Sequence, residues 1–339
     1  MIKAWAAKTQ GGALERHDYD PGPLPADEVE IAVESCGLCH SDVSLIDNEW
    51  FVSEYPLVPG HEIIGRVSKV GAHVSHLSPG DMVGVGWFAH SCLTCHTCMS
   101  GDHNMCNDAK GVAAAHQGRF GGFADTVRAQ GAWAVPLPEG VDAAKAGPLF
   151  CGGITVFNPI VQNNIRPTDR VGVIGIGGLG HMALKFLKAW GCEVTAFTSS
   201  EAKAEEARAM GAHRIVNSRD KEALKAEAGR FDMVLSTVNV PLKWSSYINA
   251  LAPRGKLHMV GAVMEPVPVV AVSLFGNQRS LTGSAVGAPA TIATMLDFCA
   301  RHDIAPQTEH LPMSKVNEAI AKLKAGDARY RIVLENDFA

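Results

Sequence analysis

The chain has 339 residues, of which 47% are hydrophobic and 19% charged; this is the composition of a folded protein, and at roughly 100–200 residues per domain the length predicts two domains. The 30 Lys and Arg residues against 35 Asp and Glu residues give a net charge of -5, which argues against a broad surface for nucleic acid. No apolar run approaches the roughly 20 residues that cross a bilayer, and the first residues lack the apolar core of a signal peptide, so we expect a cytoplasmic protein without nucleic-acid or membrane partners.

Residues 1–150 predict a β-rich domain. Short runs of β-forming residues at 29–33, 63–70, 82–85 and 133–135 are separated by glycine and proline. This pattern is typical of strands joined by turns.

Four of the nine cysteines, Cys92, Cys95, Cys98 and Cys106, follow one another in a single polar segment. Their spacing, C-x2-C-x2-C-x7-C, offers four thiolates to one ion, as in the closed tetrahedral shell of structural zinc. A ferredoxin-type iron–sulfur cluster would continue C-x3-C-P, which this segment does not. Disulfides are disfavoured in a reducing compartment, and buried core thiols do not suit so polar a segment. We therefore predict a structural zinc site.

From about residue 165 strands alternate with helices. The strands are expected at 170–174, 193–197, 214–216, 232–236 and 256–260, and the helices at 179–190, 202–210 and 221–228. Such alternation predicts a parallel, doubly wound sheet. Two further helices, 290–302 and 316–325, and a closing strand, 331–334, follow it.

A glycine loop joins the strand at 170–174 to the helix after it. The segment reads G-x-G-x-x-G and contains Gly175, Gly177, Gly178, Leu179 and Gly180. Glycines in this strand–turn–helix context let backbone amides approach a pyrophosphate at the positive end of the helix. The loop predicts a dinucleotide site.

The segment after the next strand bears on the choice of cofactor. An acid there would bind the adenosine ribose of NAD, and this chain has Ser199, Ser200 and Lys203 instead. Two hydroxyls and an ammonium suit the 2′-phosphate of NADP, whereas Glu201 in the same loop is the argument for NAD. Ser199 and Ser200 are also candidates to cap the following helix, a role compatible with phosphate binding.

Several segments together resemble the zinc-dependent medium-chain alcohol dehydrogenases. Gly60-His61-Glu62-x2-Gly65-x5-Gly71-x2-Val74 looks like the zinc signature of that family, and the cysteine lobe, the glycine loop and Cys151-Gly152-Gly153-Ile154-Thr155 follow in its order. The resemblance covers essentially the whole chain. Within the family, the chain is most similar to the cinnamyl alcohol dehydrogenase branch and to bacterial NADPH-dependent aldehyde reductases, through residues 46–50, 151–157 and 175–181.

The resemblance implies a GroES-like catalytic domain at 1–150 and 286–339 and a Rossmann domain at 151–285. It also implies a catalytic zinc bound by Cys39, His61 and Cys151, with Glu62 as a transient ligand and Asp42 orienting the imidazole of His61. Two zinc ions per chain, NADP(H) and a homodimer are part of the same expectation.

The proton pathway is implied in the same way. In relatives, the residue matching Ser41 hydrogen-bonds the substrate oxygen, and its proton passes through the cofactor ribose to a residue three positions on. Many relatives have histidine there, but this chain has Ser44. Since serine does not titrate near neutral pH, we expect the relay to end in water or in a neighbouring group.

Other contacts follow from the resemblance. Thr155 and Ser284 are implied beside the nicotinamide, and Trp50 and Trp87 in a pocket for apolar or aromatic aldehydes, although the tryptophans would equally suit core packing. Arg329 and Arg331 are candidates for a cofactor-phosphate contact or, alternatively, exposed charges at a strand edge.

The function implied is reversible, NADPH-dependent reduction of aldehydes to primary alcohols. One alternative is an NAD-dependent secondary-alcohol or polyol dehydrogenase on the same scaffold, against which the Ser199–Lys203 segment argues. The other is a non-enzymatic NADPH-binding sensor, which would not require the full set of Cys39, His61, Cys151 and Asp42.

Overall fold

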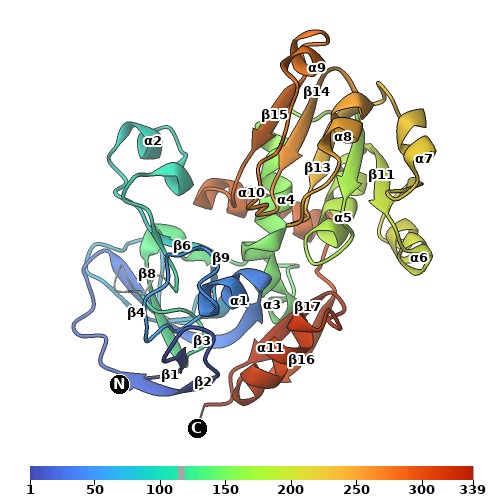
Figure 1. Cartoon of the computed structure of the whole chain (residues 1–339). Helices are drawn as coiled ribbons and strands as arrows, with labels where there is room; N and C mark the ends of the chain where they lie inside the picture. Colours follow the sequence, from blue (N-terminus) through green and yellow to red (C-terminus); the bar gives the residue numbers. More distant parts are fainter. Residues whose placement is uncertain (114–118, 339) are drawn as a thin grey trace. The chain divides into compact units, whose positions relative to one another are not determined.

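The computed structural model describes residues 1–113 and 119–338, and the chain divides into two compact units (Figure 1). The β-rich unit comprises Met1–Ile154 and Val286–Ala339, and the α/β unit comprises Thr155–Ala285. In the described part of the chain, no helix is both long enough and apolar enough to cross a membrane.

A seven-stranded sheet forms the framework of the β-rich unit. Its strands lie in the order β16-β17-β3-β4-β5-β9, and β8 also pairs with β3. β16 and β17 are parallel, and the other pairs are antiparallel. Their bounds are β3 Glu28–Leu38, β4 Ile63–Val70, β5 Met82–Val85, β8 Thr126–Gln130, β9 Val135–Pro136, β16 Thr308–Pro312 and β17 Arg331–Glu335. Two pairs lie outside this sheet: β1 Ile2–Ala7 with β2 Leu14–Tyr19, and β6 Phe88–His90 with β7 Lys110–Gly111.

The predicted strand at 133–135 is wrong at its start. Gly131–Trp133 form the 3-10 turn η3 because the amide of Ala134 bonds back to the carbonyl of Gly131, and β9 begins only at Val135. The remaining helices of this unit are α1 His40–Ile46, α2 His96–Met99, η1 His103–Met105, α3 Ala143–Ala146, η4 Gly147–Phe150, α10 Pro289–His302, η5 Met313–Lys315 and α11 Val316–Lys324.

The α/β unit is built on a six-stranded sheet in the order β12-β11-β10-β13-β14-β15, parallel throughout. The strands are β10 Arg170–Ile174, β11 Glu193–Thr198, β12 Arg214–Asn217, β13 Phe231–Ser236, β14 Leu251–Met259 and β15 Ser280–Gly283. The order of the strands along the chain reverses between β10 and β13. At such a switch point the carboxyl ends of the strands bind dinucleotides.

Helices connect these strands: α5 Gly180–Trp190, α6 Glu201–Ala209, α7 Lys221–Ala226, α8 Trp244–Ala250 and α9 Ala271–Phe275, after α4 Gly152–Gln162 has led into the unit. The central strands are fully buried, as Val171, Val173 and Val194 illustrate, and this explains why continuous apolar runs predicted them. The doubly wound sheet predicted from the sequence is confirmed.

Candidate metal and cofactor sites

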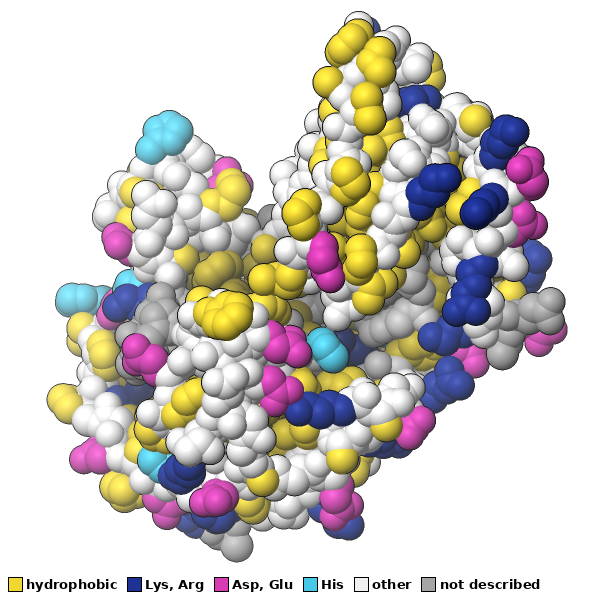
Figure 2. All heavy atoms as spheres, in the orientation of Figure 1, with side chains coloured by type: hydrophobic (Ala, Val, Ile, Leu, Met, Phe, Trp, Pro, Cys, Tyr) yellow, Lys and Arg dark blue, Asp and Glu magenta, His cyan; other side chains and the backbone are white. Residues whose placement is uncertain are grey.

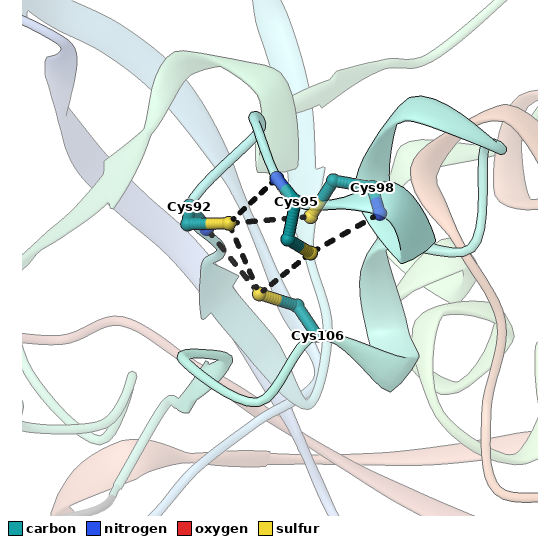
Figure 3. Close-up of side chains that lie close together, drawn as sticks. All are labelled: Cys92, Cys95, Cys98 and Cys106. Carbon is teal, nitrogen blue, oxygen red and sulfur yellow. Dashed lines mark hydrogen bonds between the residues drawn. The ribbon is translucent and has the colours of Figure 1, made fainter.

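Cys92, Cys95, Cys98 and Cys106 turn their sulfur atoms toward one another in the lobe formed by α2 and η1 (Figure 3). The Sγ atoms lie 3.9 Å apart for Cys92 and Cys98, 3.9 Å for Cys95 and Cys106, and 3.5 Å for Cys92 and Cys106. Four sulfurs at 2.3 Å around a tetrahedral zinc ion would lie roughly 3.8 Å apart. The geometry of the lobe therefore fits a four-thiolate zinc ion.

Backbone amides support the charge that such a site needs. The N–H groups of Cys95 and Cys98 donate to the sulfurs of Cys92 and Cys95, at 3.3 and 3.4 Å. Amide donors at Thr94 and Cys95 lower the pKa of Cys92 to about 6. Zinc binds the thiolate form of cysteine, so these contacts favour metal binding.

A second cluster brings together residues far apart in the sequence. Cys39 precedes α1, His61 and Glu62 precede β4, and Cys151 lies between η4 and α4; all four side chains are buried. Sγ of Cys151 lies 4.0 Å from Sγ of Cys39 and 3.2 Å from Nε2 of His61. Two thiolates and an imidazole are the ligand set of catalytic zinc sites that keep a fourth position open.

Asp42 holds two members of this cluster in place. Its Oδ2 accepts from the amide of Cys39 at 2.9 Å, and its Oδ1 accepts from the amide of Gly60 at 2.9 Å and from Nδ1 of His61 at 2.8 Å. Since Nδ1 is occupied in this way, Nε2 is free to face the two sulfurs. One buried carboxylate thus fixes the ring of His61 and the loop of Cys39 together.

Glu62 forms an ion pair with Arg331 of β17, and both side chains are buried. The expectation that Arg331 contacts a cofactor phosphate is wrong, and so is its alternative of an exposed charge, because β17 lies inside the sheet between β16 and β3. Oε2 of Glu62 is buried without a hydrogen-bond partner among the described residues. Burial raises the pKa of Glu62 to about 7, against the opposing charge of Arg331.

Two tryptophans form an aromatic wall beside the cluster. The ring of Trp87 lies 4.9 Å from that of His61 at 77°, and Trp50 lies 6.0 Å from Trp87 at 62°. Both tryptophans are half-buried, so each retains apolar surface beyond its packing.

The two serines of α1 differ in their surroundings. Ser41 is half-buried in the first turn, whereas Ser44 is buried and donates a 2.6 Å hydrogen bond to Oε2 of the exposed Glu49. This partner could not be predicted from the sequence, because nothing in the spacing shows that the chain turns back after α1.

The glycine loop lies at the carboxyl end of β10 and leads into α5. A Cβ built on Gly180 would fall 1.9 Å from the carbonyl oxygen of Gly175, so only glycine permits this close turn. A Cβ on Gly177 meets nothing within 4 Å. The space above Gly177, together with the neighbouring Gly178 and Leu179, is where backbone amides can meet a pyrophosphate.

The residues after β11 were predicted to cap the next helix and to bind a cofactor phosphate. The hydroxyl of Ser200 caps α6 by accepting from the amide of Lys203 at 3.4 Å, while Ser199 is exposed and Lys203 half-exposed. α6 begins at Glu201, whose side chain lies outside the described residues.

Two further candidates lie elsewhere in the α/β unit. Thr155 is buried in α4. Ser284 follows β15, and its Oγ lies 2.9 Å from Nε2 of His258. His258 was expected only as a strand residue, because its partners are distant in sequence.

Comparisons with known proteins agree with this architecture. Residues 25–139 match the alcohol dehydrogenase GroES-like domain, and residues 178–301 match the zinc-binding dehydrogenase family. The chain is 54% identical to the aldehyde reductase AdhA of Synechocystis over 99% of both chains. It is 37% identical to the probable cinnamyl alcohol dehydrogenase 6 of Arabidopsis thaliana, over 98% of this chain and 93% of that one.

Solved structures show the same likeness. A cinnamyl alcohol dehydrogenase of Sorghum bicolor superposes with a TM-score of 0.93 at 37% identity, over 98% of this chain and 97% of that one. The corresponding enzyme of Helicobacter pylori, solved with NADP(H), gives 0.89 at 28% identity over 98% and 97%. The predicted GroES-like and Rossmann architecture is confirmed.

Proposed function

The chain belongs to the zinc-binding medium-chain alcohol dehydrogenase family, in its cinnamyl alcohol dehydrogenase branch, and we propose that it reduces aldehydes to primary alcohols with NADPH. The reaction class is reversible oxidoreduction of aldehydes and alcohols, and it is supported by the sequence identity to an aldehyde reductase over nearly the whole chain. The observation that carries the proposal is the buried cluster of Cys39, His61 and Cys151, with His61 oriented by Asp42.

Zinc bound there would polarise the carbonyl oxygen of an aldehyde, and NADPH would supply the hydride. The chain's own residues prepare this chemistry. Asp42 fixes the ligand geometry, and Arg331 balances the charge of Glu62, the transient ligand of our proposal. With the four-cysteine lobe as a second, structural site, we expect two zinc ions per chain.

NADPH is preferred over NADH in this proposal because of the segment after β11. Lys203 and the exposed hydroxyl of Ser199 can meet a 2′-phosphate, and Ser200 keeps the start of α6 in register. A phosphate near a cation and a helix start is favourable. The related enzyme of Helicobacter pylori was solved with NADP(H).

The aromatic wall of Trp50 and Trp87 supports an apolar or aromatic aldehyde as substrate. The proton follows a separate route. In aldehyde reduction Ser41 would donate a proton to the substrate oxygen, and Glu49 would replace it through Ser44; alcohol oxidation would run this route in reverse. Glu49 is then the neighbouring group at the end of the relay.

A homodimer fits the edge of the six-stranded sheet. β15 is an edge strand, and exposed hydrophobic side chains lie on and before it: Met264, Val270, Val272, Phe275 and Leu281. Figure 2 shows hydrophobic side chains gathered over α9 and β15. An unpaired apolar edge is a template for a second copy.

None of the nine cysteines forms a disulfide, which supports a reducing, cytoplasmic setting.

The test is a comparison of initial rates with NADPH and NADH across straight-chain, branched and aromatic aldehydes, before and after chelation of the metal. We expect turnover with NADPH that is lost on chelation and returns with zinc. A preference for NADH with secondary alcohols would favour the polyol dehydrogenase alternative. Binding of NADPH by zinc-loaded protein without any turnover would favour the sensor.

The double variant Ser199→Asp with Lys203→Ala tests the phosphate contact. It should lose most of the NADPH preference, whereas the exposed Lys221→Ala on α7 should keep it. An unchanged preference in the double variant would remove these residues from the proposal.

A further inference from the structure

His258 is fully buried near the carboxyl end of β14, and polar side chains of three residues, one after α4 and two in or just after β15, surround its ring. Nδ1 lies 3.1 Å from Nδ2 of Asn163 and 2.9 Å from Oγ1 of Thr282. Nε2 lies 2.9 Å from Oγ of Ser284. A buried histidine with partners on both nitrogens has its tautomer fixed by them.

The amide of Asn163 decides which tautomer is present. Its Nδ2 donates to the carbonyl oxygen of Pro159 at 2.9 Å, and a carbonyl can only accept, so the NH2 group must lie on this side. The same NH2 group faces Nδ1 of His258. Nδ1 is therefore an acceptor, and the proton of the neutral ring is on Nε2.

The ring is also kept neutral. Burial and the nearby charge of Lys256 lower the pKa of His258 to about 4. The Nε2–H group then has one partner, Oγ of Ser284, to which it donates. Since that oxygen accepts from His258, the hydroxyl proton of Ser284 points elsewhere.

The place of Ser284 suggests where its proton goes. Ser284 is half-exposed at the carboxyl end of β15, the end at which parallel sheets bind ligands. The glycine loop follows β10, and the proposed phosphate contact follows β11, so a bound cofactor would place its pyrophosphate and adenosine over that half of the sheet. Its nicotinamide would then lie over the half formed by β13, β14 and β15.

We propose that His258 is a positioning residue that turns the hydroxyl of Ser284 outward as a donor to the carboxamide oxygen of the nicotinamide. This inference rests on the proposed function, because it requires that the α/β unit binds NADPH. It deepens that function by assigning a role to a residue that does not itself touch the cofactor.

Two amide substitutions separate this role from simple packing. In His258→Gln the side-chain NH2 can reach the position of Nε2 and still donate to Ser284. In His258→Asn the shorter amide reaches only the position of Nδ1. We expect NADPH to bind within about twofold of the wild type in His258→Gln and about tenfold more weakly in His258→Asn, the size of one hydrogen bond. Equal losses in both variants would overturn the proposal in favour of packing.

The measurement is NADPH affinity by calorimetry with the full-length, zinc-loaded protein. Ser284→Ala, which removes a half-exposed hydroxyl, keeps the test independent of folding around His258. It should weaken NADPH binding about as much as His258→Asn does. The double variant that combines Ser284→Ala with His258→Asn should lose no more affinity than either single variant. Additive losses, or unchanged affinity in Ser284→Ala, would overturn the proposal. If the wild type itself binds no NADPH, the proposed function fails instead.

The chemical contact has its own readout. Thionicotinamide NADP, whose sulfur is a weak acceptor, should bind the wild type less well than NADP, and Ser284→Ala should bind the two alike. Nitrogen-15 NMR of histidine in the cofactor-free protein should show the Nε2–H tautomer for His258. A persistent discrimination in Ser284→Ala, or an Nδ1–H tautomer, would contradict the inference.

Discussion

Ser44 and Glu49 connect the buried face of α1 to the surface through a single hydrogen bond of 2.6 Å. The hydroxyl is buried, the carboxylate is exposed, and the hydroxyl is the donor. A serine can relay a proton in such a pair only if its partner exchanges protons with solvent, and the exposed carboxylate of Glu49 is placed to do so.

Replacing either partner should change the dependence of the rate on pH. Ser44→His introduces a group with a pKa of about 6.5, so aldehyde reduction should decline more steeply than in the wild type as pH rises through that value. Glu49→Gln should slow alcohol oxidation at pH 7 on the order of tenfold or more, because the base is lost. Initial rates between pH 5.5 and 9 make the comparison.

Glu54→Gln is the control for this pair, because Glu54 is exposed in the same loop. It should behave as the wild type. An unchanged pH–rate profile in Ser44→His would end the argument for a relay through position 44.

Asp42→Asn should weaken zinc binding at the Cys39–His61–Cys151 cluster. The carboxylate accepts three hydrogen bonds, and an amide would turn an N–H against at least one of those donors. Loss of such a supporting contact typically lowers metal affinity about 10–100-fold. Competition with a fluorescent chelator measures this, and one tightly held zinc ion should remain in the cysteine lobe.

Asp18→Asn, on exposed β2, is the matched control and should retain both ions. If Asp42→Asn also retained both with unchanged affinity, Asp42 would have no part in metal binding.

Trp50→Ala should lower kcat/KM for aromatic aldehydes by up to about tenfold, the value of one aromatic contact, and leave small straight-chain aldehydes little changed. Trp50 packs on Trp87, and Trp87 lies against His61. Removing the Trp50 side chain therefore widens the space beside Trp87 without changing a proposed zinc ligand. Phe51→Ala, at the neighbouring residue whose side chain is 87% exposed, should have little effect. An equal fall for all aldehydes would indicate general damage and not a substrate contact.

How far the sequence predicts this molecule depends on how local each signal is. The run at 170–174 and the glycine loop are contiguous, so strand, turn and helix could be assigned from composition alone. β15 was missed because Ser280–Gly283 is short and only partly buried at the sheet edge, and therefore has no apolar run. Trp133 was assigned to a strand because aromatic residues favour strands, whereas a 3-10 turn holds it.

Side-chain contacts between segments that are distant in the sequence could not be predicted. Arg331 was misjudged because its partner Glu62 lies on another strand of the sheet, far away in the sequence. His258 had no assigned role because Asn163 and Ser284 come from different elements. Cys39, His61 and Cys151 were predicted as zinc ligands from the family resemblance, since spacing alone could not group them.

A last prediction concerns stability and the ion pair of Arg214 and Glu227 in the α/β unit. The guanidinium donates two hydrogen bonds to the carboxylate, at 2.8 and 2.7 Å, and these lower the pKa of Glu227 below its usual value. A depressed folded-state pKa stabilises the fold above the unfolded pKa, near 4.5, and this contribution is lost as pH falls through the folded value. Glu227→Gln should therefore lower the free energy of unfolding by about 1–2 kcal/mol at pH 7, allowing for the partly exposed Arg214, and by much less near pH 3. Urea unfolding at both pH values measures this difference. Glu222→Gln is the control, because the exposed pair of Glu222 with Lys225 should contribute almost nothing to stability. If Glu227→Gln lowered the free energy of unfolding equally at both pH values, the charge of Glu227 would not be the source of the effect.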